Sequence, residues 1–201
     1  MKDLIIGAIT KLSWEQCLPW VNSINRSGFT GDKVVCIFGE DRELAEKFVA
    51  EGFQPLLTRY LNDNENVCVT RFFMYYVYLM QNPNKYRAVF ATDVTDVLFQ
   101  NNPSEFIDKV HNEESEECIW LSAENIKYAD ETWGRNNLTI SFGPAAFERL
   151  KNNEIVNCGV LAGTQELIKD LFLNIHLACD GKPHYVQGPR FGGPDQAALN
   201  Y

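Results

Sequence analysis

Short apolar runs alternate with helix-like segments through the first half of this chain. The strand-like runs span residues 4–9, 34–38, 53–57 and 88–91, and the helix-like segments span residues 13–28, 41–51 and 69–81. Such alternation is typical of an α/β domain whose sheet is largely parallel. A length of 201 residues fits one domain. We therefore predict that residues 1–201 form a single α/β domain with a mixed, mainly parallel central sheet flanked by helices.

Several further segments can be assigned from local signals. Ser13 and Gln16 have the spacing of a capping box, and Pro103 and Glu105 open another helix. We expect strands at residues 119–122 and 154–162, a helix at 164–179, a solvated turn at 111–117 and a flexible loop at 181–193. The irregular, polar stretch at 124–143 reads as a substrate loop.

Composition excludes some classes of protein. The chain is 45% hydrophobic and carries a net charge of −9 with scattered basic residues, which argues against a nucleic-acid partner. Its six cysteines are widely spaced without a Cys-x-x-Cys pattern, so we expect reduced core thiols. No apolar stretch approaches 18 residues, and the first ten residues are too polar for a signal peptide. We therefore expect no transmembrane segment and a cytoplasmic location.

The strand at residues 88–91 leads into two closely spaced carboxylates, Asp93 and Asp96. Two ionised carboxylates roughly 6 Å apart repel by about 3 kcal/mol at an effective dielectric near 20, so a positive group is expected between them. Arg87 lies roughly 20 Å away along an extended chain and is a poor candidate. Hard carboxylate oxygens select magnesium, manganese or calcium, and magnesium commonly also binds substrate phosphates. In the simpler interpretation, Asp93 caps a turn and Asp96 is solvated.

The acidic pair lies where an open α/β sheet usually binds its ligand. It follows a strand and precedes the helix that opens at Pro103. Ligands of such sheets bind outside the carboxyl ends of the strands. The sequence thus favours a divalent cation carrying a diphosphate at this position.

Five separated pieces, taken in order, resemble a GT-A-fold glycosyltransferase of the Asp-x-Asp type, which uses a nucleotide-diphospho-sugar. The pieces are Ile9-Thr10, Arg71, Asp93-Val94-Thr95-Asp96, Asn157-Cys158-Gly159 and Asp195-Gln196. Their order and spacing match the family across nearly the whole chain. The resemblance implies a Rossmann-like GT-A domain, with Mn²⁺ or Mg²⁺ at Asp93 and Asp96. It also implies donor contacts from the residues Ile9, Thr10, Arg71, Asp93, Val94, Thr95, Asn157, Gly159 and Gln196.

The chain departs from the family pattern in two ways. Its acidic motif is Asp-x-x-Asp, so either both aspartates bind the metal or only Asp96 does, with Thr95 near the sugar. Many family members supply a third metal ligand after the Asp-Gln helix, and the chain ends at Tyr201. That ligand is then water, His184, or a residue of further domains C-terminal to this chain. The size and the start resemble cytosolic glycosyltransferases of bacteria or of large algal DNA viruses, whose capsid proteins are glycosylated.

Several of these residues also have simpler interpretations. Arg71 could extend from its helix to a surface acid, and Asn157 with Gly159 could form a strand bulge. Asp195 could cap the last helix. Glu124 could be a solvated loop residue. Tyr128 and Trp133 could either stack on a sugar or fill a loop core.

The function that these features predict is transfer of a sugar from a UDP-sugar to a hydroxyl of a glycan or glycoprotein acceptor. An inverting enzyme needs a carboxylate base, for which Asp195 or Glu124 would serve, whereas a retaining enzyme needs none.

A phosphatase of the haloacid-dehalogenase type would need an acid at Thr95. A sugar-phosphate nucleotidyltransferase would need a glycine-rich loop at residues 7–11, which are poor in glycine. A non-catalytic carbohydrate-binding module on the same fold is the remaining alternative.

Overall fold

The computed structural model describes residues 1–61, 65–110, 117–183, 185–187 and 190–201 as one α/β domain built on a six-stranded sheet. The strands lie in the order β3-β2-β1-β4-β6-β5. Their bounds are β1 Lys2–Thr10, β2 Asp32–Phe38, β3 Gln54–Thr58, β4 Tyr86–Thr92, β5 Ile119–Lys127 and β6 Glu154–Thr164. Neighbouring strands among β3, β2, β1 and β4 pair in parallel. Strand β6 pairs antiparallel with both β4 and β5. The predicted mixed, mainly parallel sheet is confirmed.

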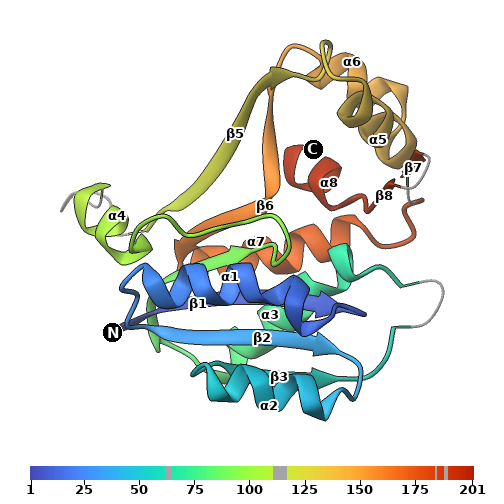
Figure 1. The fold of residues 1–201 in the computed structure, drawn as a ribbon. Coiled ribbons are helices and arrows are strands. Elements are labelled where there is room, and N and C mark those ends of the chain that lie inside the picture. The colour runs from blue at the N-terminus through green and yellow to red at the C-terminus, as the bar shows by residue number, and fades with distance from the viewer. Residues whose placement is uncertain (62–64, 111–116, 184, 188–189) are drawn as a thin grey trace.

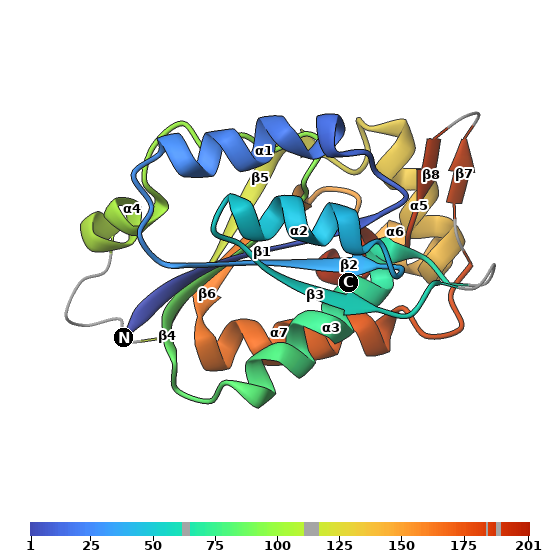
Figure 2. The same ribbon diagram turned by 60° about the horizontal axis from the view of Figure 1, so that its bottom comes forward.

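Two pairs of helices cover the two faces of this sheet. Helices α1 (Trp14–Arg26) and α2 (Arg42–Ala50) lie on one face, and α3 (Val67–Gln81) and α7 (Gln165–Ala178) lie on the other (Figure 2). Alternate side chains of the central strands point to opposite faces. Ile5 and Ile9 therefore pack under α1 and α2, whereas Leu4 and Ile6 pack under α3 and α7. The capping box predicted at Ser13 and Gln16 is present at the start of α1.

Strand β6 continues past the end of β4, and this overhang shapes one edge of the molecule. Thr92, the last residue of β4, pairs with Val160, so residues 154–159 project beyond it. The overhang pairs with the second half of β5, and the two strands rise away from the rest of the sheet in Figure 1. Helices α5 (Thr132–Phe142), α6 (Pro144–Leu150) and α8 (Asp195–Asn200) lie along this extension, while α4 (Pro103–Val110) lies at the opposite end.

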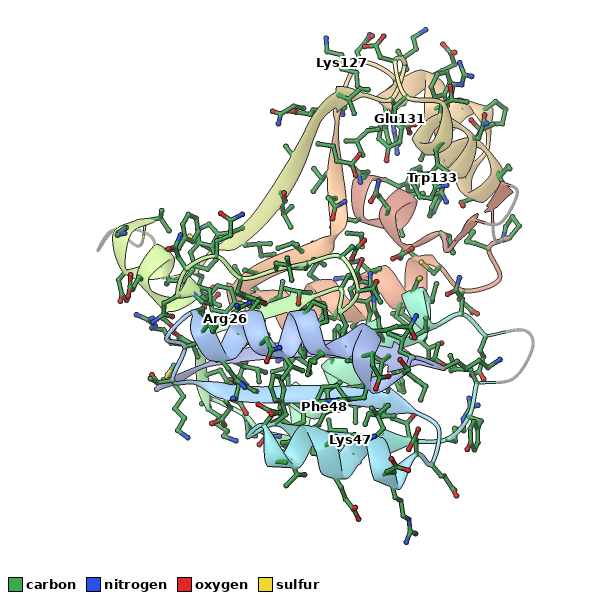
Figure 3. The ribbon with its side chains drawn as sticks, viewed as in Figure 1. Arg26, Lys47, Phe48, Lys127, Glu131 and Trp133 are labelled. Atoms are coloured by element: carbon green, nitrogen blue, oxygen red, sulfur yellow. The ribbon has the colours of Figure 1, made fainter. Side chains whose placement is uncertain are left out.

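The predicted substrate loop at residues 124–143 is wrong, because most of it is regular structure. β5 runs to Lys127, since the overhang of β6 offers it a pairing partner, and α5 follows (Figure 3). The side chain of Glu131 caps α5 by accepting hydrogen bonds from the N–H groups of Trp133 and Gly134. Glutamate is not among the preferred N-cap residues, so this start left no clear signal in the sequence. Tyr128 is 1% exposed in a small core, as the packing interpretation expected.

The predicted flexible loop at residues 181–193 is also wrong in part. It contains two short strands, β7 (Tyr185–Gln187) and β8 (Arg190–Gly192), which pair antiparallel. α5 holds the end of this segment, because Asn137 Nδ2 donates to Gly193 O at 3.0 Å. A side chain at Gly192 would come 2.6 Å from Trp133, so this indole packs against β8. Residues 111–116 of the expected turn, and His184, lie outside the described residues.

Two general expectations can be compared with the structure. All six cysteines are free, and Cys17, Cys36, Cys158 and Cys179 are buried as predicted for core thiols, whereas Cys68 and Cys118 are only partly buried. Within the described ranges, no helix is both long enough and apolar enough to cross a bilayer.

A buried ion pair joins β1 to β4 at the end of the sheet remote from the acidic motif. Asp3 is 7% exposed and accepts hydrogen bonds from Arg87 Nε at 3.0 Å and Arg87 Nη2 at 2.6 Å. Burial alone would raise the pKa of Asp3, but hydrogen bonds from Arg87 and Ser104, the charge of Arg87 and the N–H of Ala88 together lower it. Arg87 is thus committed to Asp3 and Asp108, far from Asp93 and Asp96.

We predict that Asp3→Asn loses stability at neutral pH and that its deficit shrinks as the pH falls below about 4. The folded pKa of Asp3 is lower than the unfolded one. The contribution of the ionised group is therefore complete above the unfolded pKa and is lost as the pH falls through the folded pKa. Urea unfolding of both proteins between pH 3 and pH 7 measures this. In an Arg87→Met background the pH dependence of the deficit should shrink or reverse, because burial then raises the pKa of Asp3 without opposition from Arg87. A deficit that is constant with pH in the wild-type background would contradict the prediction.

Candidate functional site

The loop that carries the acidic motif is anchored on three sides. Asp93 N donates to Gly159 O of β6 at 2.8 Å. Trp20 Nε1 of α1 donates to Thr92 Oγ1 at 2.9 Å. Val94 is buried and lies so close to β1 that a side chain at Gly7 would come 2.8 Å from it. The carboxyl end of β4 and the following turn are therefore held in one position.

Arg71 supplies the positive group that the acidic motif requires. It extends from α3, is 8% exposed, and its Nη1 contacts Asp93 Oδ1. Its Nη2 donates to Asp195 Oδ2 at 3.1 Å and to Cys158 O at 3.2 Å. Asp195 is buried and Asp93 is half-buried, so Arg71 does not extend to a fully exposed surface acid. Its contact with phosphate or uracil stays a prediction.

One guanidinium thus contacts two carboxylates, Asp93 and Asp195, and Asp96 lies near enough to be affected by its charge. Asp195 is 6% exposed, and burial raises its pKa, with the charge of Arg71 opposing the rise. Asp96 is exposed in the turn, and partial burial and the charge of Asp93 raise its pKa as well. When ionised, Asp93, Asp96 and Asp195 carry more negative charge than Arg71 can neutralise. The cluster can therefore attract a further cation.

A cavity of about 220 Å³ opens beside this cluster, at the carboxyl ends of β1 and β4. It is lined by Ala8, Ile9, Thr10, Leu12, Val67, Cys68, Arg71, Asp93, Val94 and Thr95. Six of the nine residues predicted to contact a donor are in this lining: Ile9, Thr10, Arg71, Asp93, Val94 and Thr95. The Nε atom of Arg71 is buried without a hydrogen-bond partner among the described residues.

Asn157, Gly159 and Gln196 form a second group on the overhang of β6. Asn157 Oδ1 accepts from Gly159 N at 2.7 Å, and Gln196 Oε1 accepts from Cys158 N at 3.3 Å. The pairing of β5 with β6 jumps here, since Leu121 pairs with Leu161 and Ser122 with Asn157. The bulge interpretation is confirmed, and a contact between Asn157 and a sugar stays a prediction.

Glu124 is tied to this second group and is not a loop residue. It lies on β5 with its side chain exposed. Its Oε1 accepts from Asn157 Nδ2 at 3.0 Å and from Gln196 Nε2 at 3.1 Å. Two amides from two elements thus orient one carboxylate toward the same edge of the sheet as Asp93.

Asp195 has a different environment from Glu124. It is the first residue of α8, and Pro194 holds the N-cap position. Asp195 is therefore not the N-cap residue, although its carboxylate accepts hydrogen bonds from the backbone N–H groups of Asp195 and Gln196 in the first turn. Its carboxylate is buried against Arg71, which leaves it less available to an incoming ligand than Glu124.

The residues around Asp93 fit a divalent cation that brings most of its own ligands. Asp93 Oδ2 lies beside Gly159, where a side chain would come within 2.6 Å, and the missing side chain leaves room there. No group of three or more His, Cys, Asp or Glu suited to a metal occurs in the part of the chain that the structure describes. Asp93 and Asp96 would then supply two oxygens, with substrate phosphate and water completing the shell.

Sequence reasoning missed the contribution of the first turn of α3. Val67 and Cys68 line the cavity, but the helix was predicted to begin at residue 69. The signal that could have located this start is Asn66, a favoured N-cap residue whose side chain accepts from Cys68 N at 2.9 Å.

Comparison with known proteins relates the fold to glycosyltransferases. No protein-family model matches the chain, and no curated protein matches its sequence. Among solved structures, the chain is similar to the glycosyltransferase GlyE of Streptococcus pneumoniae TIGR4, with a TM-score of 0.53 and 14% identity over 99% of this chain and 42% of GlyE. It is also similar to mouse xyloside xylosyltransferase 1 in its apo form, with a TM-score of 0.58 and 12% identity over 98% of this chain and 80% of that one. The chain thus spans less than half the length of GlyE, and the shared feature is the fold.

We predict that Gly159→Ala lowers the free energy of unfolding by about 1–3 kcal/mol, the usual cost of overpacking. The added methyl group would lie 2.6 Å from Asp93 Oδ2 and 3.0 Å from Asn157 Oδ1. Most of this loss should vanish in an Asp93→Ala background, because the shorter side chain opens the space. Urea unfolding of the four proteins measures the coupling.

The matched control is Gly163→Ala on the same strand. Its methyl group would meet Cys118 O at 2.9 Å, away from the acidic motif. Its cost should therefore be the same with or without the Asp93 side chain. Equal costs of Gly159→Ala in the two backgrounds would contradict the close approach of Gly159 to Asp93.

Proposed function

We propose that this chain is a metal-dependent glycosyltransferase that transfers a sugar from a nucleotide-diphospho-sugar, with UDP-sugars as first choice, to a hydroxyl of a glycan or glycoprotein acceptor. The observation that carries the proposal is the cavity at the ends of β1 and β4. Residues that a glycosyltransferase resemblance assigned to the donor surround it, on a fold that solved glycosyltransferases share. Because all six cysteines are free, we place the activity in the cytoplasm.

The donor side of the proposal rests on charge. The diphosphate would lie near Asp93 and Asp96 through Mn²⁺ or Mg²⁺, and near Arg71 directly. A divalent cation held there would stabilise the negative charge that grows on the departing nucleoside diphosphate. Ile9 and Thr10, at the end of β1, would contact the base, while Val94 and Thr95 close the cavity on the side of the motif.

The acceptor side of the proposal rests on Glu124. Its carboxylate is exposed, lies on β5, and is oriented by Asn157 of the overhang and by Gln196 of α8. A carboxylate in that position can take the proton of an attacking hydroxyl if the reaction inverts the anomeric centre. Asp195, the other predicted base, would instead position Arg71, since its oxygen is already held by that guanidinium.

We predict that MnCl₂ together with UDP raises the melting temperature of the wild-type chain, because a ligand at about 100 times its Kd stabilises by about 2.7 kcal/mol. For a chain of this size that corresponds to a rise of roughly 5–10 °C. Asp96→Ala should abolish the shift, whereas Asp170→Ala, at an exposed position on α7, should retain it. Differential scanning fluorimetry with UDP, GDP and dTDP ranks the donors. No metal-dependent shift with any of them would contradict the proposal.

We predict that Glu124→Gln slows hydrolysis of the UDP-sugar that the wild-type chain prefers by about 10²-fold or more, as expected for loss of a general base. The release of UDP measures this rate. Its thermal shift with MnCl₂ and UDP should stay unchanged, because Glu124 does not line the donor cavity. Glu154→Gln, at an exposed acid that begins β6, is the control and should leave the rate unchanged. An unchanged rate in Glu124→Gln would remove this residue from catalysis and favour a retaining reaction.

A further inference from the structure

Arg71 holds an oxygen of the carboxylate that the proposed metal would need. Its Nη1 contacts Asp93 Oδ1, and the Arg71 side chain is 10% exposed, so solvent screens its charge less than that of a surface arginine. A guanidinium and a divalent cation repel each other when both approach one carboxylate. Metal and Arg71 therefore compete for Asp93.

Arg71 has a second carboxylate within reach if it gives up Asp93. Its Nη2 already donates to Asp195 Oδ2 at 3.1 Å and to Cys158 O at 3.2 Å. Its Nε has no partner among the described residues, and the side chain lines the cavity in which we place the diphosphate. The guanidinium can therefore keep one ion pair and use its remaining N–H groups for a new anion.

We propose that Arg71 is a displaceable counter-ion, which neutralises Asp93 in the free protein and passes to Asp195 and the donor diphosphate when a divalent cation binds Asp93. This inference rests on the proposed function, because it assumes a metal and a diphosphate at this site. It adds that the two bind cooperatively. Metal alone must separate Arg71 from Asp93, whereas the diphosphate brings the negative charge that the released guanidinium needs. By linkage, each of the two ligands strengthens the binding of the other by the same factor.

The test is Arg71→Met, for which the inference expects two effects of opposite sign. Mn²⁺ alone should bind about tenfold more tightly or better than to the wild-type chain, because its competitor and the repulsion from it are gone. UDP in the presence of saturating Mn²⁺ should bind at least about tenfold more weakly, because a charge-assisted contact to the diphosphate is lost. Isothermal titration calorimetry of the two proteins gives both constants.

A purely structural role for Arg71 would not produce this pattern. Loss of a buried ion pair that merely shapes the site would weaken the binding of Mn²⁺ and of UDP together. Tighter binding of Mn²⁺ to Arg71→Met supports the inference. Unchanged or weaker binding of Mn²⁺ to a folded Arg71→Met protein overturns it.

Asp195→Asn is the second variant, and it can still contradict the inference if Arg71→Met does not fold. Without the charge of Asp195, Arg71 has Asp93 as its remaining carboxylate partner, so Mn²⁺ alone should bind several-fold more weakly. Where Arg71→Met folds, Asp195→Asn should weaken the binding of Mn²⁺ less in the Arg71→Met protein than in the wild-type chain. This difference separates the effect that acts through Arg71 from the direct loss of a negative charge. Binding of Mn²⁺ to Asp195→Asn that equals the wild-type value overturns the inference.

The wild-type titration separates failure of this inference from failure of the proposed function. If the wild-type chain binds UDP with Mn²⁺ but the variants behave as a structural role predicts, only the role of Arg71 is wrong. If the wild-type chain binds neither Mn²⁺ nor UDP in the presence of Mn²⁺, the donor site itself is wrong, and the inference fails with it.

Discussion

The arrangement of the site depends on one buried guanidinium. Arg71 joins Asp93, 22 residues away in the sequence, to Asp195, 124 residues away, and it also contacts the backbone of β6 at Cys158. It therefore fixes helix α3, the turn after β4 and the start of α8 relative to one another. Removal of one partner from such a buried cluster leaves an uncompensated charge, which typically costs about 3–5 kcal/mol. Asp93 and Asp195 can remain close together, with Asp195 buried, because this positive charge lies between them.

The reversed strand β6 brings the remaining groups to the same place. In an all-parallel sheet the residues beyond the end of β4 would have no neighbouring strand beside them. Because β6 runs the other way and is longer, it passes the end of β4 and carries Asn157 and Gly159 alongside Asp93. Helix α8 docks on this overhang through Asn200, which donates to Val156 O at 2.8 Å and accepts from Val156 N at 2.9 Å. The last helix thereby places Asp195 against Arg71 and Gln196 against Glu124.

What could be predicted from the sequence was local. The alternation of apolar runs and helical patterns gave the α/β class, and Asp93 and Asp96 could be placed because they directly follow a buried strand. The partners of Arg71 could not be predicted, since they depend on how three distant segments pack. The extension of β5 to Lys127 was missed for the same reason: its exposed side chains carry no strand pattern, and only pairing with the overhang of β6 defines it. The start of α5 was missed because Glu131, an uncommon cap, holds it.

The electrostatics of the cluster connect stability with ligand binding. In the free protein one guanidinium is shared between two buried or half-buried carboxylates, and a third, Asp96, has a pKa raised by burial and by Asp93. Packing alone cannot remove the repulsion among these acids, because the cavity beside them leaves the cluster open on one side. A ligand that carries both a cation and phosphate oxygens would complement both charges: its cation would neutralise Asp93 and Asp96, and its phosphate would pair with Arg71. The binding of such a ligand would therefore reduce the repulsion among these carboxylates and stabilise the folded protein.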